Sequence, residues 1–163
     1  LATIQLGWKE PTPIQETAIP LVLEGRDILA KARTGSGKTG AYAIPLLHKV
    51  LNMKKLKASK QSTSALILTP SRELCNQAYK NLQELTVYCQ REISVIDISS
   101  THVNFKNQKQ SLATRPDIIV STPTKILAHL KDNENQAYSN ELKSSLELLV
   151  IDEADLLLSF GYE

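Results

Sequence analysis

Residues 32–39, Ala-Arg-Thr-Gly-Ser-Gly-Lys-Thr, have the residue types and spacing of a phosphate-binding loop. The apolar run 28–30 precedes them and a mostly apolar helical pattern follows, which predicts a strand, a loop and a helix in that order. Glycines let successive backbone N–H groups point at phosphate oxygens, and the helix adds the positive end of its dipole. Lys38 would reach the outer phosphates and the Thr39 hydroxyl would bind Mg²⁺. The strict pattern begins with glycine, whereas this sequence has Ala32, so an ordinary Gly/Ser-rich turn before a helix stays an alternative until a second motif is found.

Two acidic residues, Asp152 and Glu153, follow a predicted buried strand at 147–151. At a strand end, an aspartate can hold the Mg²⁺ that bridges the β- and γ-phosphates, and a glutamate can polarise the attacking water. The structural alternative is that both residues stabilise a helix N-terminus through its dipole. That alternative explains one acidic residue but does not explain a phosphate loop upstream. We therefore interpret the two motifs as parts of one nucleotide-hydrolysing site.

The elements that must position these motifs alternate between apolar strands and helices. Besides 28–30 and 147–151, strands are predicted at 65–69, 93–98 and 117–121. Helices are predicted at 38–52, from Ser71 as N-cap through Cys89, at 104–114 and from Thr122, with polar loops at 53–64 and 132–141. Continuous apolar strands alternating with helices favour an α/β fold in which helices cover both faces of a parallel sheet. Ligands bind such sheets beyond the carboxyl ends of the strands, where all the motifs singled out here lie: 32–39, 70–73, 98–100, 122–123 and 152–155.

Residues 12–15 predict the start of another helix. Thr12 suits the N-cap, Pro13 the first helical position and Gln15 the third position of a capping box. We expect this helix to be interrupted near Pro20 and to end by Gly25. The residue pattern favours this structural role for Gln15, while the alternative is that its amide reads a base through paired donor and acceptor atoms.

Composition restricts the class of protein further. The 163 residues, 42% hydrophobic and 22% charged, suit one soluble globular domain, and a net charge of +2 is too small to indicate nucleic acid by itself. No apolar run is long enough to cross a membrane. Cys75 and Cys89, on one predicted helix, would lie about 21 Å apart, which excludes a disulfide and favours a reducing compartment, the cytosol or the nucleus. Because the sequence opens at Leu1 without a methionine, we expect a portion of a longer protein.

These motifs together resemble the first RecA-like domain of DEAD-box RNA helicases. Residues 152–155, Asp-Glu-Ala-Asp, resemble the motif that names the family, and 32–39 match its form of the phosphate loop, in which alanine replaces the first glycine. Residues 7–15 resemble the adenine-recognising Q motif, which implies that the amide of Gln15 reads the adenine edge. The resemblance covers 1–163 and implies a RecA-like ATP-binding domain.

The resemblance implies ATP and Mg²⁺ as the ligands of the site. By it, Lys38 and Glu153 are the catalytic residues, Thr39 and Asp152 hold the metal partly through water, and Asp155 couples the site to RNA binding. The implied nucleotide-binding residues are Trp8, Gln15, Arg33, Thr34, Gly35, Ser36, Gly37, Lys38 and Thr39.

Three further segments resemble the RNA-contacting motifs of the family. Residues 70–75 resemble the first motif with Ser71 for threonine and Cys75 for alanine, and 122–125 resemble the second with Thr124 for glycine and Lys125 for arginine. Residues 99–100 are serines where a glycine pair is usual. Helix N-termini and small hydroxyls suit a grip on single-stranded RNA by its phosphates. The implied RNA-binding residues are Pro70, Ser71, Arg72, Glu73, Ser99, Ser100, Thr122 and Pro123.

The resemblance also implies parts that this sequence does not contain. The family's Ser-Ala-Thr motif lies on a strand between those of the phosphate loop and Asp152, so we expect a gap in the sheet there. Without the second RecA-like domain and its arginine fingers, the chain alone should bind nucleotide weakly and turn over negligibly. The implied whole is an ATP-dependent RNA helicase that remodels RNA or ribonucleoprotein, with no membrane partner.

In its overall residue pattern the sequence is similar to the nucleolar subgroup of the family linked to assembly of the large ribosomal subunit. This similarity implies a role in ribosome biogenesis and a location in the nucleus, specifically the nucleolus. The alternative location is the cytoplasm. Two other classes stay open: a non-catalytic fragment that binds RNA or a partner, and a phosphate-loop ATPase that acts on a target other than RNA.

Overall fold

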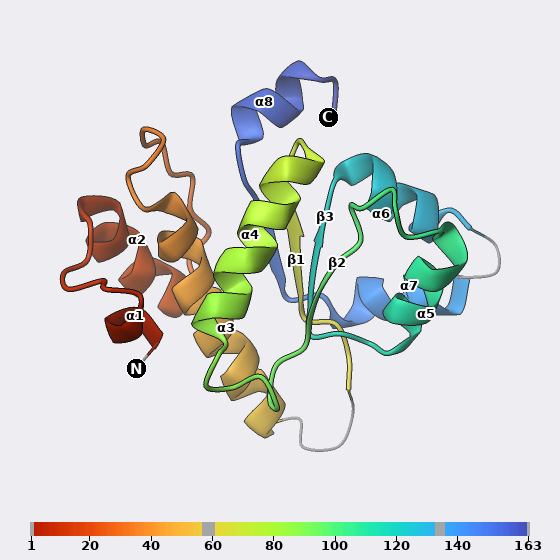
Figure 1. Ribbon diagram of the computed structural model, residues 1–163, viewed down its shortest axis with the longest axis horizontal. Helices are drawn as coiled ribbons and strands as arrows, with labels where there is room; N and C mark the ends of the chain where they lie inside the picture. The colour runs from red at the N-terminus through yellow and green to blue at the C-terminus, as the bar shows by residue number, and fades with distance from the viewer. Residues whose placement is uncertain (1, 57–60, 133–135, 163) are drawn as a thin grey trace.

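A parallel sheet forms the centre of the computed structural model, which describes residues 2–56, 61–132 and 136–162 (Figure 1). The strand order is β2-β3-β1-β4. In β1, Ala65 is level with Ile118 of β3 and Leu148 of β4, so the strands end at the same edge of the sheet. The strands are β1 (Ala65–Leu68), β2 (Val95–Asp97), β3 (Ile118–Ser121) and β4 (Leu148–Ile151).

Helices cover both faces of this sheet, as the sequence predicts (Figure 1). Side chains alternate along a strand, and in β1 Ile67 joins the core cluster on one face while Leu66 joins the cluster on the other. On the first face lie α3 (Lys38–Leu56) and α4 (Arg72–Leu85), and on the second lie α5 (Phe105–Ala113), α6 (Pro123–Leu130) and α7 (Gln136–Ser145). The remaining helices are α1 (Ala2–Gln5), α2 (Pro13–Leu23) and α8 (Ala154–Ser159). Within the described ranges, no helix is long and apolar enough to cross a membrane.

The strand predicted at 28–30 is wrong. The residues from Arg26 to Arg33 form no strand, and Leu29 is 95% exposed. On the described part of the chain β4 pairs with β1 alone, and the side chains of Leu149 and Ile151 are about half exposed. A segment becomes a strand only when a neighbour accepts and donates its ladder hydrogen bonds, and no described strand lies beside 28–30. The structure thus agrees with the gap expected between this segment and the strand before Asp152.

The predicted interruption of one helix and the predicted ends of two others also need correction. α2 continues through Pro20 to Leu23, because the carbonyl that loses its hydrogen bond belongs to the exposed Glu16, where water can replace it. The polar loop predicted at 53–64 begins late, since α3 runs on to Leu56 with Met53 packed against the core. Cys89 lies beyond the end of α4, but both cysteines are free, as predicted.

The polar loop predicted at 132–141 is largely helical. α7 begins at Gln136, and it forms because Leu142 is buried against the second face of the sheet, with Ser139 also buried. Residues 57–60 and 133–135 of the two predicted loops lie outside the described residues.

Asp117, directly before β3, is a buried anion that joins three parts of the fold. Its side chain is 1% exposed, and Oδ2 accepts from Lys54 Nζ of α3 at 2.9 Å. The same oxygen accepts from the Ser94 backbone N–H at 2.8 Å and from the Ser94 hydroxyl at 2.9 Å. Lys54, which falls in the predicted basic loop, therefore has a structural partner.

We expect Asp117→Ala to lower the free energy of unfolding by about 3 kcal/mol, because it leaves the partners of a buried carboxylate without an acceptor. Urea denaturation followed by circular dichroism measures the change. Asp27→Ala is the control: Asp27 is exposed, so its loss should change stability by less than about 0.5 kcal/mol. Equal effects of the two substitutions would contradict the structural role of Asp117.

Candidate nucleotide-binding site

The phosphate loop depends on backbone conformations that side chains disfavour. Gly35 and Gly37 have φ of +80° and +93°, in the left-handed region. A Cβ on Gly37 would lie 2.7 Å from both Thr12 Oγ1 and Gln15 Nε2, closer than van der Waals contact allows. Residues 32–39 therefore form the expected glycine-dependent loop, and α3 begins at Lys38 within it.

Gln15 joins the segment 7–15 to this loop. Its side chain is buried, Oε1 accepts from the Thr12 N–H at 3.1 Å, and Nε2 donates to the Gly37 carbonyl at 3.1 Å. The first bond is half of the predicted capping box, so the structural interpretation of Gln15 is confirmed to that extent. That Gln15 reads adenine stays a prediction.

Two buried hydroxyls at the loop have no hydrogen-bond partner on the described part of the chain. They are Thr12 Oγ1, which faces Gly37, and Ser36 Oγ within the loop. Buried polar atoms are normally satisfied, so these two hydroxyls have hydrogen-bonding capacity left for a polar ligand. The residues at the loop fit a bound nucleotide in this respect.

Trp8 packs on the first turn of α3 at Gly40. A Cβ on Gly40 would lie 2.6 Å from Gln15 Nε2 and 2.9 Å from the Trp8 ring. Gly40 thus allows the segment 7–15 to approach the helix that follows the phosphate loop. The sequence analysis did not identify Gly40 as part of the site; the only signal was a glycine inside a helical pattern, which often marks a close approach.

Lys38 and Glu153, 115 positions apart in sequence, form an ion pair. Lys38 Nζ lies 2.9 Å from Glu153 Oε1, and the side chains are 25% and 30% exposed. The hydrogen bond to Glu153 raises the pKa of Lys38 above its ordinary value, against the opposing effect of burial, and the charges of Glu153, Asp152 and Asp155 add to the rise. The structure thus brings the two predicted catalytic residues together and keeps both accessible.

The backbone turns sharply between the two acidic residues. Asp152 continues the ladder of β4 by donating its N–H to the Leu68 carbonyl at 2.9 Å, whereas Glu153 has φ of 51°, in the left-handed region. Such a conformation costs a residue with a side chain about 1 kcal/mol. Asp152 Oδ1 accepts from the Glu153 N–H at 3.0 Å, which supports the turn. The strained residue is the one whose carboxylate meets Lys38.

Tyr42 is a member of the site that the sequence analysis missed. Its hydroxyl donates to Asp152 Oδ2 at 3.2 Å. Burial, followed by the negative charge of Asp152, raises the pKa of Tyr42 well above its ordinary value, so the hydroxyl stays protonated. Helical spacing was the available signal, because Tyr42 lies three positions after Thr39 and four after Lys38.

Asp152 and Thr39 offer a donor set that fits Mg²⁺. This ion is commonly held by one or two carboxylates together with substrate phosphates and water, rather than by a cage of protein ligands. On the described residues there is no group of three or more histidine, cysteine, aspartate or glutamate side chains that could hold a metal by itself. One carboxylate and one hydroxyl beside a phosphate loop suit an ion that arrives with its nucleotide.

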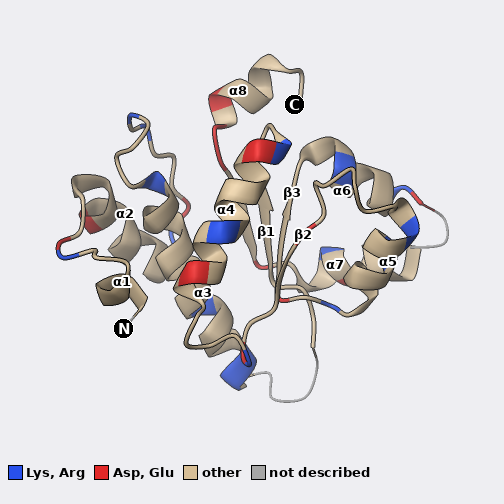
Figure 2. Ribbon diagram, viewed as in Figure 1, with Lys and Arg blue, Asp and Glu red and all other residues tan. Residues whose placement is uncertain are grey.

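The predicted RNA-binding residues gather at the ends of the other three strands. Ser71 caps α4 by accepting the Leu74 N–H at 3.2 Å, and Arg72 Nη1 donates to Thr101 Oγ1 at 2.6 Å in the loop after β2. Glu73 has a lowered pKa because its carboxylate accepts its own backbone N–H and then the Ser71 hydroxyl. Figure 2 shows this pair of opposite charges at the first turn of α4. Pro70 precedes them, partly buried.

A side chain of α5 hydrogen-bonds the loop that follows β2. Gln108 Nε2 donates to the Ser100 carbonyl at 2.7 Å, and the buried side chain of Gln108 also meets His129 Nε2 of α6 at 3.0 Å. Ser99 is 1% exposed, so only Ser100 of the two serines has a partly accessible side chain. Thr122 stands at the N-cap of α6 without a side-chain capping bond, and Pro123 is buried behind it.

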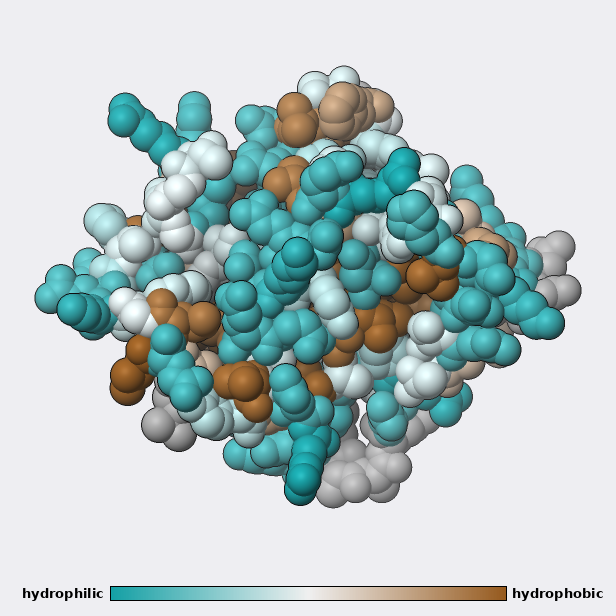
Figure 3. All heavy atoms as spheres, viewed as in Figure 1, coloured by the Kyte–Doolittle hydropathy of each residue, from teal (hydrophilic) through white to brown (hydrophobic). Residues whose placement is uncertain are grey.

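Asp155 and the surface around it lie apart from these contacts. Asp155 is exposed in the first turn of α8, where its charge contributes to the raised pKa of Lys38. Apolar side chains gather over α8 in Figure 3, and Leu156, Leu158 and Phe160 are each more than 40% exposed. The coupling role of Asp155 stays a prediction.

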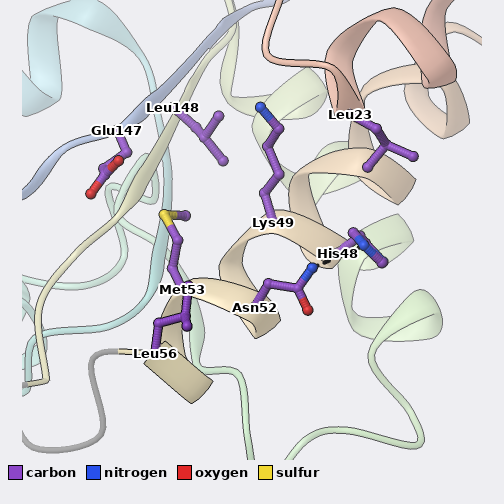
Figure 4. Close-up of a pocket in the computed structure, with 8 residues that line it drawn as sticks. All are labelled: Leu23, His48, Lys49, Asn52, Met53, Leu56, Glu147 and Leu148. Atoms are coloured by element: carbon purple, nitrogen blue, oxygen red, sulfur yellow. Dashed lines mark hydrogen bonds between the residues drawn. The ribbon is translucent and has the colours of Figure 1, made fainter.

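A hollow lies at the other end of the sheet and contains none of the predicted site residues. It is lined by Leu23 at the end of α2, by Met53 in the second half of α3 and by Leu148 at the start of β4 (Figure 4). Because it lies at the amino-terminal end of β4, it belongs to a different region from the phosphate loop.

The geometry agrees with comparisons to known proteins. The family model described as DEAD/DEAH box helicase matches residues 12–163. A protein of Dictyostelium discoideum named probable ATP-dependent RNA helicase ddx56 is 45% identical over 159 residues, 98% of this chain and 22% of that protein. The ATP-dependent RNA helicase dbp9 of Sclerotinia sclerotiorum is 46% identical over 157 residues, 96% of this chain and 24% of that protein.

A solved structure gives the same fold. The structure titled DEAD-box helicase Mss116 bound to ssRNA and UDP-BeF superposes with a TM-score of 0.86 at 27% identity, over 99% of this chain and 31% of that one. Fold and site thus define a phosphate-loop domain of the RecA-like class. The chain belongs to the DEAD/DEAH box helicase family and spans about a quarter of the length of the curated relatives that it matches.

We expect Gly40→Ala to destabilise the domain and to increase the exposure of Trp8, which is already 37% exposed. An alanine normally stabilises the interior of a helix relative to glycine by about 1 kcal/mol, whereas here the added methyl group displaces Gln15 and Trp8. Because Trp8 is the single tryptophan in the sequence, a red shift of its fluorescence together with a lower unfolding midpoint measures the effect. A higher unfolding midpoint without a change in the fluorescence spectrum would show that the contact of residue 40 with Trp8 and Gln15 can accommodate a methyl group.

Proposed function

We propose that the protein containing this chain is an ATP-dependent RNA helicase, in which this domain binds ATP and Mg²⁺ and grips single-stranded RNA. The observation that supports it best is the pairing of Lys38 with Glu153 beside the phosphate loop, at 2.9 Å. The names of the relatives, each an RNA helicase, support the assignment of RNA as substrate. A second RecA-like domain and a structured RNA or ribonucleoprotein complete the proposed set of partners.

The ion pair suggests how the residues act in turn. An incoming γ-phosphate competes with Glu153 for Lys38, and a pair that is a quarter to a third exposed costs little to separate. Lys38 then neutralises phosphate charge, and the released carboxylate of Glu153 orients the attacking water. Thr39 and Asp152 would hold Mg²⁺, which would neutralise phosphate charge when bound.

RNA would bind where three strand ends meet. Ser71, Ser100 and Thr122 offer hydroxyls or helix N-termini at neighbouring ends of β1, β2 and β3, and Arg72 adds positive charge. Such contacts bind phosphates without reading bases. We further propose action in large ribosomal subunit assembly in the nucleolus, on the resemblance of the sequence to that subgroup of the family.

Replacing Glu153 should separate binding from hydrolysis. In the full-length protein we expect Glu153→Gln to lower RNA-stimulated ATP hydrolysis by about 10² to 10³-fold, because the carboxylate that positions water is lost. ATP binding should persist, since Lys38 is freed from its partner. Phosphate release and fluorescent-nucleotide binding, measured with and without single-stranded RNA, provide the readouts.

The matched control for this experiment is Glu84→Gln, an exposed residue of α4 that should leave hydrolysis unchanged. If the rate of ATP hydrolysis by the unsubstituted protein did not change on addition of RNA, the RNA assignment would be overturned. A Glu153→Gln variant as active as the control would overturn the catalytic role of Glu153.

Arg72→Ala should weaken RNA binding without sequence preference. Loss of one phosphate contact is expected to reduce affinity several-fold and the slope of log affinity against log salt by about 1. Fluorescence anisotropy with two unrelated single-stranded RNAs over a salt series measures both quantities. Arg91→Ala, exposed in the turn that follows α4 at the far end, is the control, and an equal loss from it would indicate non-specific charge alone.

A further inference from the structure

The hydroxyl of Tyr42 connects the helix that begins in the phosphate loop to Asp152, one of the two residues that would hold Mg²⁺. It donates to Asp152 Oδ2 at 3.2 Å, and Tyr42 lies about one turn after Thr39 in α3. α3 begins in the phosphate loop and Asp152 follows β4, so this hydrogen bond joins parts of the site that are over a hundred positions apart in sequence. We propose that Tyr42 is a positioning residue that orients Asp152 toward Mg²⁺ and thereby sets the affinity for the metal–nucleotide complex.

The ring of Tyr42 is held firmly enough to orient its partner. It packs against the core cluster on the first face of the sheet, and its neighbours Ala41 and Ala43 are buried. One turn further along, Leu46 and Leu47 anchor α3 in the same cluster. A hydroxyl fixed by a packed ring loses less freedom on hydrogen bonding than one on a flexible side chain.

For Asp152 to bind a metal ion, its carboxylate must also keep free acceptor positions. Asp152 Oδ1 accepts the Glu153 N–H at 3.0 Å and Oδ2 accepts the Tyr42 hydroxyl, so one bond on each oxygen fixes the plane of the group. A carboxylate offers about four acceptor positions, so these bonds leave room for a metal ion or its water. Partners that orient metal-binding groups in this way typically change metal affinity by about 10 to 100-fold when removed.

A purely structural role for Tyr42 predicts a different result. If the hydroxyl only satisfied a partly buried carboxylate, its removal would lower stability and weaken nucleotide binding equally with and without metal. The positioning role predicts a loss that depends on Mg²⁺. Tyr42→Phe separates the two because it removes one oxygen and keeps the packed ring.

The experiment is ADP binding to the full-length protein by calorimetry, in Mg²⁺ and in excess EDTA. For Tyr42→Phe we expect affinity to fall about tenfold in Mg²⁺ and to change less than twofold in EDTA. Binding of Mn²⁺ in the presence of ADP, followed by electron paramagnetic resonance, should weaken by the same factor. Equal losses in both media, or no loss in either, would overturn the proposal.

Two reference variants make the outcome specific. Tyr138→Phe removes a hydroxyl that bonds Thr63 Oγ1 at 3.3 Å near the amino-terminal end of β1, and it should leave ADP affinity unchanged in both media. Asp152→Asn sets the size of a full loss of the metal ligand. The inference rests on the proposed function, and the two fail differently: absence of any Mg²⁺-dependent ADP binding in the unsubstituted protein would overturn the proposed function itself.

Discussion

The site depends on side-chain contacts between the phosphate loop and the sheet. No backbone hydrogen bonds between strands connect these two parts in the described residues. The segment before the loop forms no strand, and on the described residues β4 has its outer edge unpaired. At the carboxyl edge, the ion pair of Lys38 with Glu153 and the hydrogen bond of Tyr42 with Asp152 connect α3 to the end of β4. Below them, α3 packs on the first face of the sheet, so the geometry of the site follows from a buried helix and two polar contacts.

The half of the edge that carries the proposed RNA-binding residues is organised by a different principle. There the strands β1, β3 and β2 are paired in register, and the loops that follow them are connected by Arg72 with Thr101 and by Gln108 with Ser100. Backbone pairing fixes these loops relative to one another, and the polar contacts only adjust them. The phosphate-loop half, which lacks that pairing, relies on charged side chains that a nucleotide can also bind.

Local sequence patterns were sufficient where the physics is local. The glycine spacing of the phosphate loop, the N-cap Ser71 and the acidic pair after an apolar strand were predicted because each depends on residues a few positions apart. The strand predicted at 28–30 was wrong because a strand needs a hydrogen-bonded neighbour, which this segment lacks in the described residues. The loop predicted at 132–141 was wrong because burial of Leu142 stabilises a helix there. Tyr42 and Gly40 were missed because their partners, Asp152, Gln15 and Trp8, are brought to them only by the fold.

Gln15 shows that a structural and a functional interpretation of one residue need not exclude each other. An amide side chain can make about four hydrogen bonds, two from nitrogen and two to oxygen. Here one N–H binds the Gly37 carbonyl and one lone pair accepts the Thr12 N–H, both at 3.1 Å. These two bonds fix the orientation of the amide and leave one donor and one acceptor, the pair of functions that an adenine edge requires. The capping bond, which is the alternative to base reading in the sequence, is therefore compatible with it, because the bond fixes the amide beside the phosphate loop and uses only part of its hydrogen-bonding capacity.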